Sequence, residues 1–514
     1  MSLEGVNQHQ LMVDFGPMES PFLPWMDIPD SLLLHILSFL PPKDVVIASR
    51  VCTKWHRTAT DEMLWKELFT FFFGSTGTTG KCFKLPSFSS SWLQEFQRLY
   101  SETPLIETQV LEGHSDEVLH VAFSHDGKLF ASSSKDCLAI IWEIIDGEVK
   151  VKRTLDFRKY RWEYVQFCEF SKDDTLLLVS GINERRRLNF MGEITICSID
   201  GKDDQTILHN VISEPYDVFG AWLSETHFIS GSFEFRVPFY DSSVSELWAN
   251  SIHGRNPVRL CRVLNENGSS VRNVLVAKPA FLKENELLLI FTHGVVTYIP
   301  HQIVINKITT EKDNDTFRIL PQSNIGNKNR VSEKFRLSID PDSDSDDDAE
   351  DVRFTEPDHL IETNAHIIGV GLAPDQDMLY VNCRPWIGER KAVQQRAAQW
   401  GIHEEFEISS DIHTRVYSLS SLELLKEHVG HRAFTPNDKC FFIFLDVADK
   451  LVASGAEDCC AHVWDRHYGF KLATLEGHSD VVNCVAFNPQ NPEMLISASD
   501  DQTLRVWKSR RKAK

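Results

Sequence analysis

Two segments near opposite ends of the chain repeat one another, and this self-similarity constrains the fold more than any other feature. Residues 111–142 and 475–507 both open with Leu-Glu-Gly-His-Ser-Asp, share a Val-Ala-Phe run and close on a tryptophan. The histidine and the tryptophan are 28 residues apart in the first segment and 29 in the second. An internal repeat of this kind indicates that one small structural unit is used several times along the chain.

A Gly-His opening and a terminal tryptophan, at a period of about 40 residues, resemble the WD-repeat family, in which each repeat forms a four-stranded antiparallel blade. A clear blade end lies at 451–465, and weaker copies with a strand-turn-strand pattern lie at 170–181, 218–232, 282–300 and 367–382. The resemblance implies a mainly β fold, a β-propeller of about seven blades, with six or eight as alternatives. A strand from one end of such an array usually completes the blade at the other end, and residues 106–111 are the natural candidate.

Histidine, serine, aspartate and tryptophan recur at matching positions of the repeats. The residues are His114, Ser132, Asp136 and Trp142 in the first copy, Ser454, Asp458 and Trp464 in another, and His478, Ser497, Asp501 and Trp507 in the last. Histidine, serine and aspartate are also the ingredients of a hydrolase triad. Their recurrence favours a structural hydrogen-bond network instead, because buried polar groups are stable only when they are fully paired.

The N-terminal part of the chain has a helical pattern. Leu33, Ile36, Leu37 and Leu40 follow the i, i+3, i+4, i+7 spacing of one helical face, with Asp30 placed to cap the start. Two prolines then end the helix, and further helices are expected at 44–51 and 61–72. A unit of about 45 residues cannot bury all of these apolar side chains, so the surplus predicts an interface. The alternative is a helical lid packed permanently on the rest of the chain.

This segment resembles the F-box family. The matching residues, in order and spacing, are Ile28-Pro29, Ile36-Leu37, Leu40-Pro41, Asp44, Val51-Cys52, Trp55 and Leu64-Trp65. The resemblance implies a small all-α domain that binds a Skp-type adaptor. It places the adaptor site at Pro29, Leu32, Ile36, Leu37 and Leu40, and it assigns Val51, Trp55 and Trp65 to the core of the module.

The composition divides the chain into segments. We predict a flexible N-terminus at 1–24, the F-box at 25–73, a linker with a helix at 74–104, the first part of the propeller at 105–305, an acidic disordered insertion at 306–360, the last part of the propeller at 361–509 and a basic tail at 510–514. Eight of the twelve residues at 340–351 are acidic, so this stretch cannot bury enough apolar surface to fold. Ser343 and Ser345 lie within it and resemble acidophilic-kinase sites; an unregulated spacer is the alternative.

The net charge, the cysteine count and the length of the apolar runs argue against several classes of protein. The net charge of −21 argues against a nucleic-acid partner, and eleven cysteines without a Cys-x-x-Cys pair suggest neither disulfides nor a zinc site. No metal ion or other cofactor is expected. No apolar run reaches the length of a membrane span, and the first residues do not resemble a secretory signal, so we expect the cytoplasm, with the nucleus as a further location.

An F-box followed by WD repeats resembles the F-box/WD-repeat substrate receptors of SCF-type cullin-RING E3 ubiquitin ligases. The resemblance implies a non-enzymatic subunit whose F-box binds the adaptor and cullin and whose propeller binds the protein to be ubiquitinated. Arg185, Arg186 and Arg187 form the one arginine run that resembles a substrate-binding cluster, and solvated surface charge without a binding role is the favoured alternative. Trp464-Asp465-Arg466-His467 resembles a motif for docking to the cullin-4 adaptor but lacks its final arginine. The competing hypothesis is a non-catalytic WD-repeat scaffold whose helical segment binds another partner.

Overall fold

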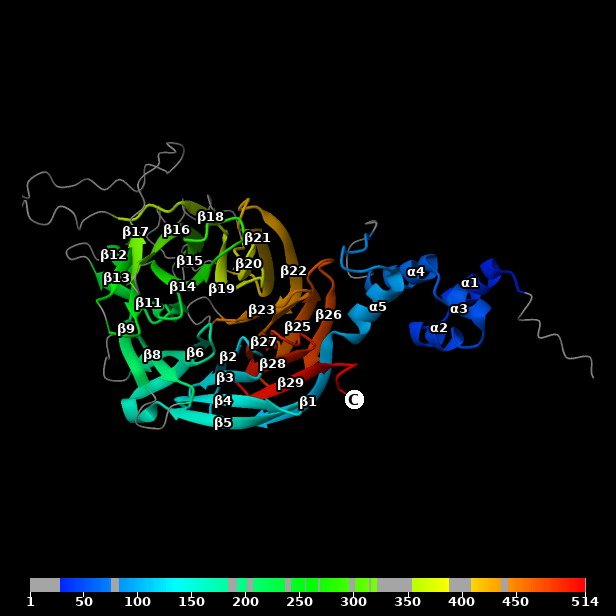
Figure 1. Cartoon of the computed structure of the whole chain (residues 1–514), viewed down its shortest axis with the longest axis horizontal. Coiled ribbons are helices and arrows are strands. Elements are labelled where there is room, and N and C mark those ends of the chain that lie inside the picture. The colour runs from blue at the N-terminus through cyan, green and yellow to red at the C-terminus, as the bar shows by residue number, and fades with distance from the viewer. Residues whose placement is uncertain are drawn as a thin grey trace, which may run out of the picture. The chain divides into compact units, whose positions relative to one another are not determined.

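The computed structural model describes most of the chain (Figure 1). The described residues are 28–74, 83–183, 192–200, 207–235, 242–254, 256–266, 269–294, 301–313, 316–320, 354–387, 408–435 and 442–513. They fall into two compact units, Met1–Arg98 and Leu99–Lys514. The first unit is helical and the second consists of β-sheets. The predicted flexible segment 1–24 lies outside the described residues.

Five helices follow one another at the N-terminal end. They are α1 (Asp30–Ser38), α2 (Pro42–Ala48), α3 (Thr53–Ala59), α4 (Glu62–Phe73) and α5 (Trp92–Ser101). Pro41 and Pro42 separate the first two helices, because proline fits the first turn of a helix but breaks its interior. Asp61 caps α4 by accepting a hydrogen bond from the backbone N–H of Met63 at 2.8 Å.

The core of the helical unit is aromatic. Trp65 and Phe69 of α4 are buried, and their rings pack against Phe96 and Trp92 of α5 with centroid distances of 5.3 and 5.0 Å. The indole N–H of Trp65 donates to the carbonyl of Ala59 at 2.7 Å, so the polar end of this buried ring is satisfied. The predicted helix in the linker is therefore α5, and its first part belongs to the core of the helical unit.

Two details of this unit differ from the prediction. The expected second helix at 44–51 ends earlier, at Ala48, and is followed by the unpredicted helix α3. Asp30 does not cap α1, because the cap position is occupied by Pro29. The carboxylate of Asp30 instead pairs with the guanidinium of Arg57 at 2.5 Å, which ties the start of α1 to α3.

The described β-strands form seven sheets arranged as the blades of a propeller (Figure 1). The first three blades contain β2 (Val118–Phe123), β3 (Leu129–Ser134), β4 (Leu138–Ile145) and β5 (Glu148–Asp156); β6 (Trp162–Phe170), β7 (Leu176–Asn183), β8 (Gly192–Ser198) and β9 (Ile207–Ser213); and β10 (Ala221–Trp222), β11 (His227–Phe235), β12 (Ser242–Ser251) and β13 (Val258–Glu266). Seven blades, rather than six or eight, are thus confirmed.

The remaining blades follow the same antiparallel order. They contain β14 (Ser270–Ala277), β15 (Glu286–Gly294), β16 (Gln302–Asp313), β17 (Thr316–Leu320) and β18 (His359–Glu362); β19 (Ala365–Leu372), β20 (Met378–Pro385), β21 (Asp411–Ser418) and β22 (Leu424–Arg432); β23 (Leu445–Val447), β24 (Leu451–Ser454), β25 (Cys460–Asp465) and β26 (Lys471–Glu476); and β27 (Val482–Phe487), β28 (Met494–Ser499) and β29 (Thr503–Ser509). The seventh sheet contributes only three strands of its own.

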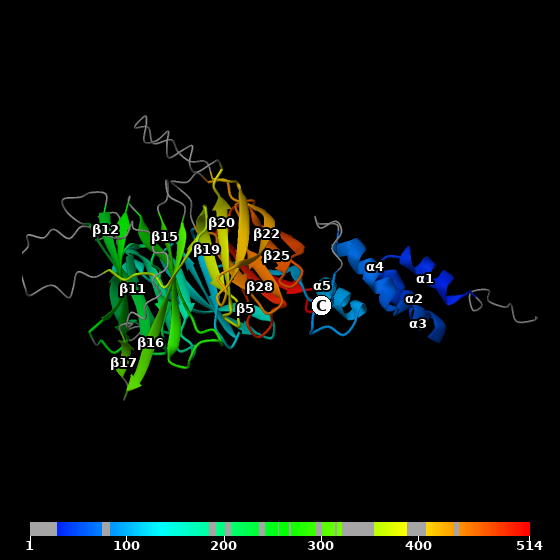
Figure 2. The ribbon, with the colours of Figure 1, turned by 90° about the horizontal axis from the view of Figure 1, so that it is seen from above.

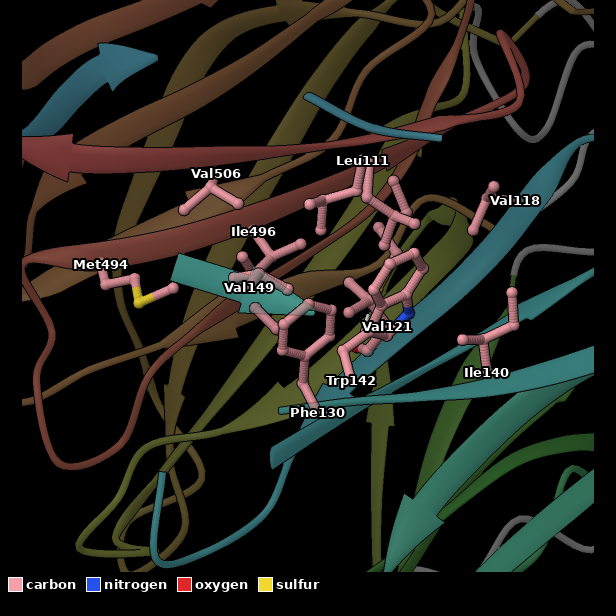
Figure 3. Packing of buried hydrophobic residues seen from close by; sticks show 14 residues of the cluster. Leu111, Val118, Val121, Phe130, Ile140, Trp142, Val149, Met494, Ile496 and Val506 are labelled. Carbon is pink, nitrogen blue, oxygen red and sulfur yellow. Dashed lines mark hydrogen bonds between the residues drawn. The ribbon is translucent and has the colours of Figure 1, made fainter. Parts of the chain in front are cut away.

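The fourth strand of the seventh blade comes from the start of the propeller. Strand β1 (Pro104–Glu112) pairs antiparallel with β29, and Leu111 lies opposite Leu504. Leu111 packs with Trp142 of the first blade and Ile496 of the seventh in one buried cluster (Figure 3). The predicted closing strand is confirmed. Because closure pairs an edge that would otherwise be open, it stabilises the ring as a whole.

The start of the predicted acidic insertion is wrong. Residue 306 lies within β16, which continues to Asp313 and pairs with β17. This hairpin reaches beyond the other labelled strands at one edge of the propeller (Figure 2). Its sequence is mostly polar from residue 306 on, so composition alone did not reveal that the strand continues. The acidic run at 340–351, with Ser343 and Ser345, lies outside the described residues.

The end of the insertion is also ordered. The backbone N–H of Thr355 donates to the carbonyl of Arg262 on β13 at 2.8 Å, and the N–H of Lys307 donates to the carboxylate of Asp358 at 2.6 Å. Residues 354–358 are therefore attached to both the third and the fourth blade. The basic tail is engaged as well, since Arg510 donates to the carbonyl of Tyr100 at 2.6 Å and lies over its ring.

Candidate functional site

One face of α1 carries large apolar side chains that remain in contact with solvent. Leu32, Ile36 and Phe39 are 55%, 39% and 75% exposed, and their i, i+4, i+7 spacing places them on one side of the helix. Leu33 and Leu37 lie on the other side and are fully buried. The helix thus separates its apolar residues into a core stripe and an outward stripe, which we call the α1 face (Leu32, Ile36, Phe39).

The predicted adaptor residues divide between these two stripes. Pro29 is exposed and Leu40 is half-buried, so both are accessible together with Leu32 and Ile36. Leu37 is the exception, because its side chain is enclosed in the helical unit. Its assignment to a contact surface is wrong for this fold, and its role is in the core.

Other apolar residues of the helical unit also remain exposed. Val51, expected in the core, is 64% exposed, whereas Trp65 is buried as expected and Trp55 is half-buried. Further exposed residues in the described part of this unit are Ile47, Met63, Phe71, Phe72 and Phe88. So many exposed apolar side chains in so small a unit have the character of an interface.

The predicted network is present in the first blade. His114 contacts the carboxylate of Asp136 through Nδ1 at 2.9 Å and the hydroxyl of Ser132 through Nε2 at 2.7 Å. The indole N–H of Trp142 donates to the same hydroxyl at 2.8 Å. Burial alone would raise the pKa of Asp136, but hydrogen bonds, led by that from His114, hold it below its usual value.

The seventh blade repeats this geometry. The distances are 2.8 Å from His478 to Asp501, 2.7 Å from His478 to Ser497, and 2.8 Å from Trp507 to Ser497. The hydroxyl of Ser497 is buried and bonded to two partners, as is that of Ser132. A serine enclosed in this way cannot meet a substrate, so these residues hold the outer turn and two strands of a blade together.

The sixth blade does not form the network, contrary to the prediction. The hydroxyl of Ser454 accepts from Asn382 of the fifth blade at 2.7 Å, and Trp464 donates to the carbonyl of Val429 at 3.2 Å. The carboxylate of Asp458 contacts His462 at 3.0 Å. His462 occupies the place that Ile140 has in the first blade, so it supplies a different partner for the aspartate.

Aromatic side chains meet on the axis of the propeller. His120 of the first blade lies 4.6 Å from Phe444, which leads into the sixth blade, and Phe219, which leads into the third, lies 4.9 Å from Phe442. Blades that are not neighbours can meet only at the axis. The guanidinium of Arg272 on the fourth blade adds to this axial cluster, 4.9 Å from the ring of Phe442. These side chains therefore meet across the axis at this level.

Comparison with known proteins agrees with both units. The F-box-like family model matches residues 25–70, and the model for the WD domain, G-beta repeat, matches 106–143 and 469–508. F-box/WD repeat-containing protein 5 of Homo sapiens is 34% identical over 94% of this chain and 94% of its own length. The chain belongs to the F-box/WD-repeat family. The protein of the same description from Mus musculus is equally similar, and F-box/WD repeat-containing protein 7 of Drosophila melanogaster is 28% identical over 25% of this chain and 10% of its own length.

Membership of the F-box/WD-repeat family associates the chain with ubiquitin ligases, and proteins of this family are generally substrate adaptors rather than enzymes. Arg185, Arg186 and Arg187, predicted to bind substrate, lie outside the described residues. Within the described residues, no group of histidine, cysteine, aspartate or glutamate side chains has the geometry of a metal site. None of the described helices is long and apolar enough to cross a membrane.

Proposed function

We propose that this F-box/WD-repeat protein is the substrate-recognition subunit of an SCF-type cullin-RING E3 ubiquitin ligase. In this assembly the helical unit binds a Skp-type adaptor, the adaptor binds the cullin, and the propeller binds the protein to be ubiquitinated. The observation that carries the proposal is the α1 face, which presents three large apolar side chains within a unit that matches the F-box-like family.

Burial of this face supplies a driving force for association. A fully buried leucine, isoleucine or phenylalanine contributes roughly 1.5 to 3 kcal/mol relative to an exposed one. Leu32, Ile36 and Phe39 still have between 39% and 75% of their surface exposed, so they retain much of that free energy for a partner. Leu33 and Leu37 of the same helix are fully buried, so α1 is held in place by the core of the unit and the ordering cost on binding is small.

The propeller contributes no chemistry in this mechanism. A subunit that holds a target near a charged ubiquitin-conjugating enzyme raises the effective concentration of the target's lysines, and this converts a bimolecular encounter into a local one. The substrate would bind to loops at one end of the propeller, since loops around a rigid scaffold are the usual place for binding residues and the aromatic rings of His120, Phe219, Phe442 and Phe444 meet across the axis.

The test is co-purification of adaptor and cullin with the full chain and with the variant L32S/I36S/F39S. We expect the variant to keep its far-UV circular dichroism spectrum and to lose both partners. A matched control, V151S/L208S/L424S, removes three exposed apolar side chains from the propeller and should retain them. Retention of adaptor and cullin by the α1 variant would contradict the proposal. If the protein is instead a scaffold whose helices bind another partner, the wild-type chain would co-purify with neither adaptor nor cullin.

Docking to the cullin-4 adaptor remains a secondary prediction, and the contacts around the motif do not favour it. Asp465 is buried, and Arg466 is bonded within the chain to the hydroxyl of Tyr380 at 3.0 Å and to Asp375 at 3.1 Å. We also propose a cytoplasmic location, with the nucleus as a second one, and phosphorylation of Ser343 and Ser345. Fractionation and phosphopeptide mapping of the full chain test these two points.

A further inference from the structure

One buried histidine of β22 lies where two other outer strands have leucine. Leu111 of β1 and Leu475 of β26 are buried, and each lies opposite the residue three positions before a tryptophan of the adjacent strand. His428 lies opposite Thr414, three positions before Tyr417, so it holds the same place on β22. Its side chain is buried as well. A titratable ring therefore stands at a point of the repeat that is otherwise apolar in these strands.

A second histidine of the same strand lacks the partners that its counterpart has. His431 corresponds to His114 of the first blade, because each follows a glycine and comes three residues after the position just described. His114 contacts the aspartate and the serine of the blade network. In the sixth blade the carboxylate of Asp458 contacts His462 instead, and the hydroxyl of Ser454 accepts from the fifth blade. His431 is fully buried, and neither of its ring nitrogens has a hydrogen-bond partner in the described part of the chain.

Both histidines lie at the seam where β22 of the fifth blade meets β25 and β26 of the sixth (Figure 1). The centroid of the His431 ring lies 4.8 Å from that of Trp464 and 5.7 Å from that of His462. The centroid of the His428 ring lies 6.1 Å from that of Trp464. Rings of the two blades thus pack on one another, so a positive charge on either histidine would be buried between the blades.

β22 is an outer strand that pairs with its own sheet on one side. Its partner there is β21, and the register of this pair shifts twice along its length. Side chains of the sixth blade hold the other side. The indole N–H of Trp464 donates to the carbonyl of Val429 at 3.2 Å, and the ammonium of Lys471 donates to the carbonyl of Gly430 at 2.7 Å. An irregular outer strand of this kind can detach locally while the rest of the propeller stays folded.

The surroundings of the two histidines oppose their protonation. Burial lowers the pKa of His431 well below its usual value, and four basic groups that face it lower the pKa further. These groups are His462 of β25, Lys471 of β26, His428 of β22 and His413 of β21. Burial, followed by the charge of Lys426, lowers the pKa of His428 to about 4. Both rings are therefore neutral in the closed seam at neutral pH.

The acidic groups of the same elements do not offset this effect. Three carboxylates there already have partners, and the pairs are Asp458 with His462 at 3.0 Å, Glu427 with Arg415 at 2.8 Å and Asp411 with Arg432 at 3.3 Å. Glu427 also contacts His413 at 3.3 Å. The other titratable groups on the strands around the seam are Tyr380 of β20, Tyr417 of β21, Cys460 and Asp465 of β25 and Glu476 of β26.

We propose that β22 is an acid-sensitive switch of the propeller, which detaches locally from the seam when His428 and His431 take up protons. When β22 is detached, water reaches both rings, so each binds a proton near the ordinary histidine pKa of about 6.5. When the seam is closed, burial and the basic neighbours keep both rings neutral. Proton uptake therefore favours the detached strand. The inference is independent of the proposed function, because it concerns the propeller alone.

The expected size of the effect follows from proton linkage. Between about pH 6.5 and pH 4 the state with β22 detached binds two protons more than the closed seam. Each extra proton shifts the equilibrium by up to about ten-fold per pH unit. From pH 6 to pH 5 the population with β22 detached should therefore rise by about 50- to 100-fold, because both histidines contribute. The closed seam is thus most stable above about pH 6.5 and loses stability as the pH falls.

The test is hydrogen exchange of the full chain, followed by mass spectrometry at about pH 6 and pH 5 and corrected for the intrinsic exchange rate. Peptides from β22 report on the seam, and peptides from β5 report on an outer strand of the first blade that contains no histidine. The variant H428L/H431L removes both titrating rings, and H428L alone keeps the test informative if the double variant does not fold. The control H293L removes a histidine of the fourth blade whose pKa burial also lowers to about 4.

We expect the exchange protection of β22 to fall by about 50- to 100-fold from pH 6 to pH 5 in wild type, and that of β5 by less than about three-fold. The fall in β22 should shrink to about eight-fold in H428L and to that of β5 in H428L/H431L, while H293L should behave as wild type. A fall in β22 no larger than that in β5, or an undiminished fall in H428L, overturns the proposal. Loss of the effect in H293L overturns it as well, because the opening would then not be local to the seam.

Discussion

Asp501 provides the sharpest test of the blade network, and we expect D501N to destabilise the propeller. Its carboxylate accepts four hydrogen bonds. They come from His478 at 2.8 Å, from the backbone N–H of Ser479 at 3.1 Å, and from the N–H and hydroxyl of Thr503 at 3.0 and 2.7 Å. An asparagine presents one acceptor and one donor. Whichever way its amide points, one backbone N–H then faces another donor.

The magnitude follows from these contacts. A hydrogen bond to a charged acceptor contributes roughly 1.5 to 3 kcal/mol, and a buried N–H without an acceptor costs roughly 1 to 3 kcal/mol. The side chain of Asp501 is 6% exposed, so water cannot replace the lost acceptor. We therefore expect the free energy of unfolding to fall by about 3 kcal/mol, measured by urea denaturation followed by circular dichroism.

Asp458 is the matched control, because it occupies the same repeat position in the sixth blade. Its side chain is 28% exposed and contacts His462 and the backbone N–H of Cys460, the latter at 3.3 Å. An asparagine can keep the contact with His462, so D458N should cost less than about 1 kcal/mol. An equal loss of stability in D458N and D501N would refute the reasoning, since the sequence motif rather than the observed bonding would then determine the energetics.

Two further perturbations test other parts of the propeller. L111A should lower the free energy of unfolding by about 3 kcal/mol, because it empties part of the buried cluster that joins the first and seventh blades; wild-type stability in urea would show that β1 contributes little to closure. Burial, with a smaller effect of Lys426, lowers the pKa of His428 in the folded protein to about 4, whereas its pKa in the unfolded chain is about 6.5. Between these two pH values the unfolded chain binds one proton more than the folded protein. The free energy of unfolding therefore decreases as the pH falls through this range. The variant H428F lacks this titrating group, so its free energy of unfolding relative to that of wild type should rise by about 3 kcal/mol from pH 7 to pH 4. A difference between the two proteins that does not vary with pH would contradict the assignment.

The repeat motif predicted most of the propeller because it encodes local bonding. His114, Ser132, Asp136 and Trp142 lie in one sequence repeat, with His114 in the loop between β1 and β2, so their sequence spacing largely determines their geometry. The sixth blade shows the limit of this inference. The hydroxyl of Ser454 accepts a hydrogen bond from Asn382, which belongs to the fifth blade. The spacing of residues within one repeat cannot reveal a partner that comes from the neighbouring blade.

Helical spacing had a similar limit in the F-box. Leu33 and Leu37 repeat at four residues, and so do Leu32 and Ile36, hence α1 has two apolar stripes with the same period. The pattern predicts the helix but cannot decide which stripe faces the core, and Leu37 was assigned to the wrong one. Packing against α3 and α4, which depends on residues far away in the sequence, makes that choice. The unpredicted exposure of Phe39 and Val51 has the same origin.

The pairing of β1 with β29 has a consequence for biosynthesis. Thr108 and Val506, which share a hydrogen bond across this pair, are 398 residues apart. At a translation rate of about 5 to 20 residues per second, the first strand waits on the order of 20 to 80 seconds for its neighbour. During that interval β1 is a strand with an unpaired edge. A chaperone that covers unpaired strands could therefore act on β1 in this period. A premature stop codon before the last repeat would leave β1 without its partner strand.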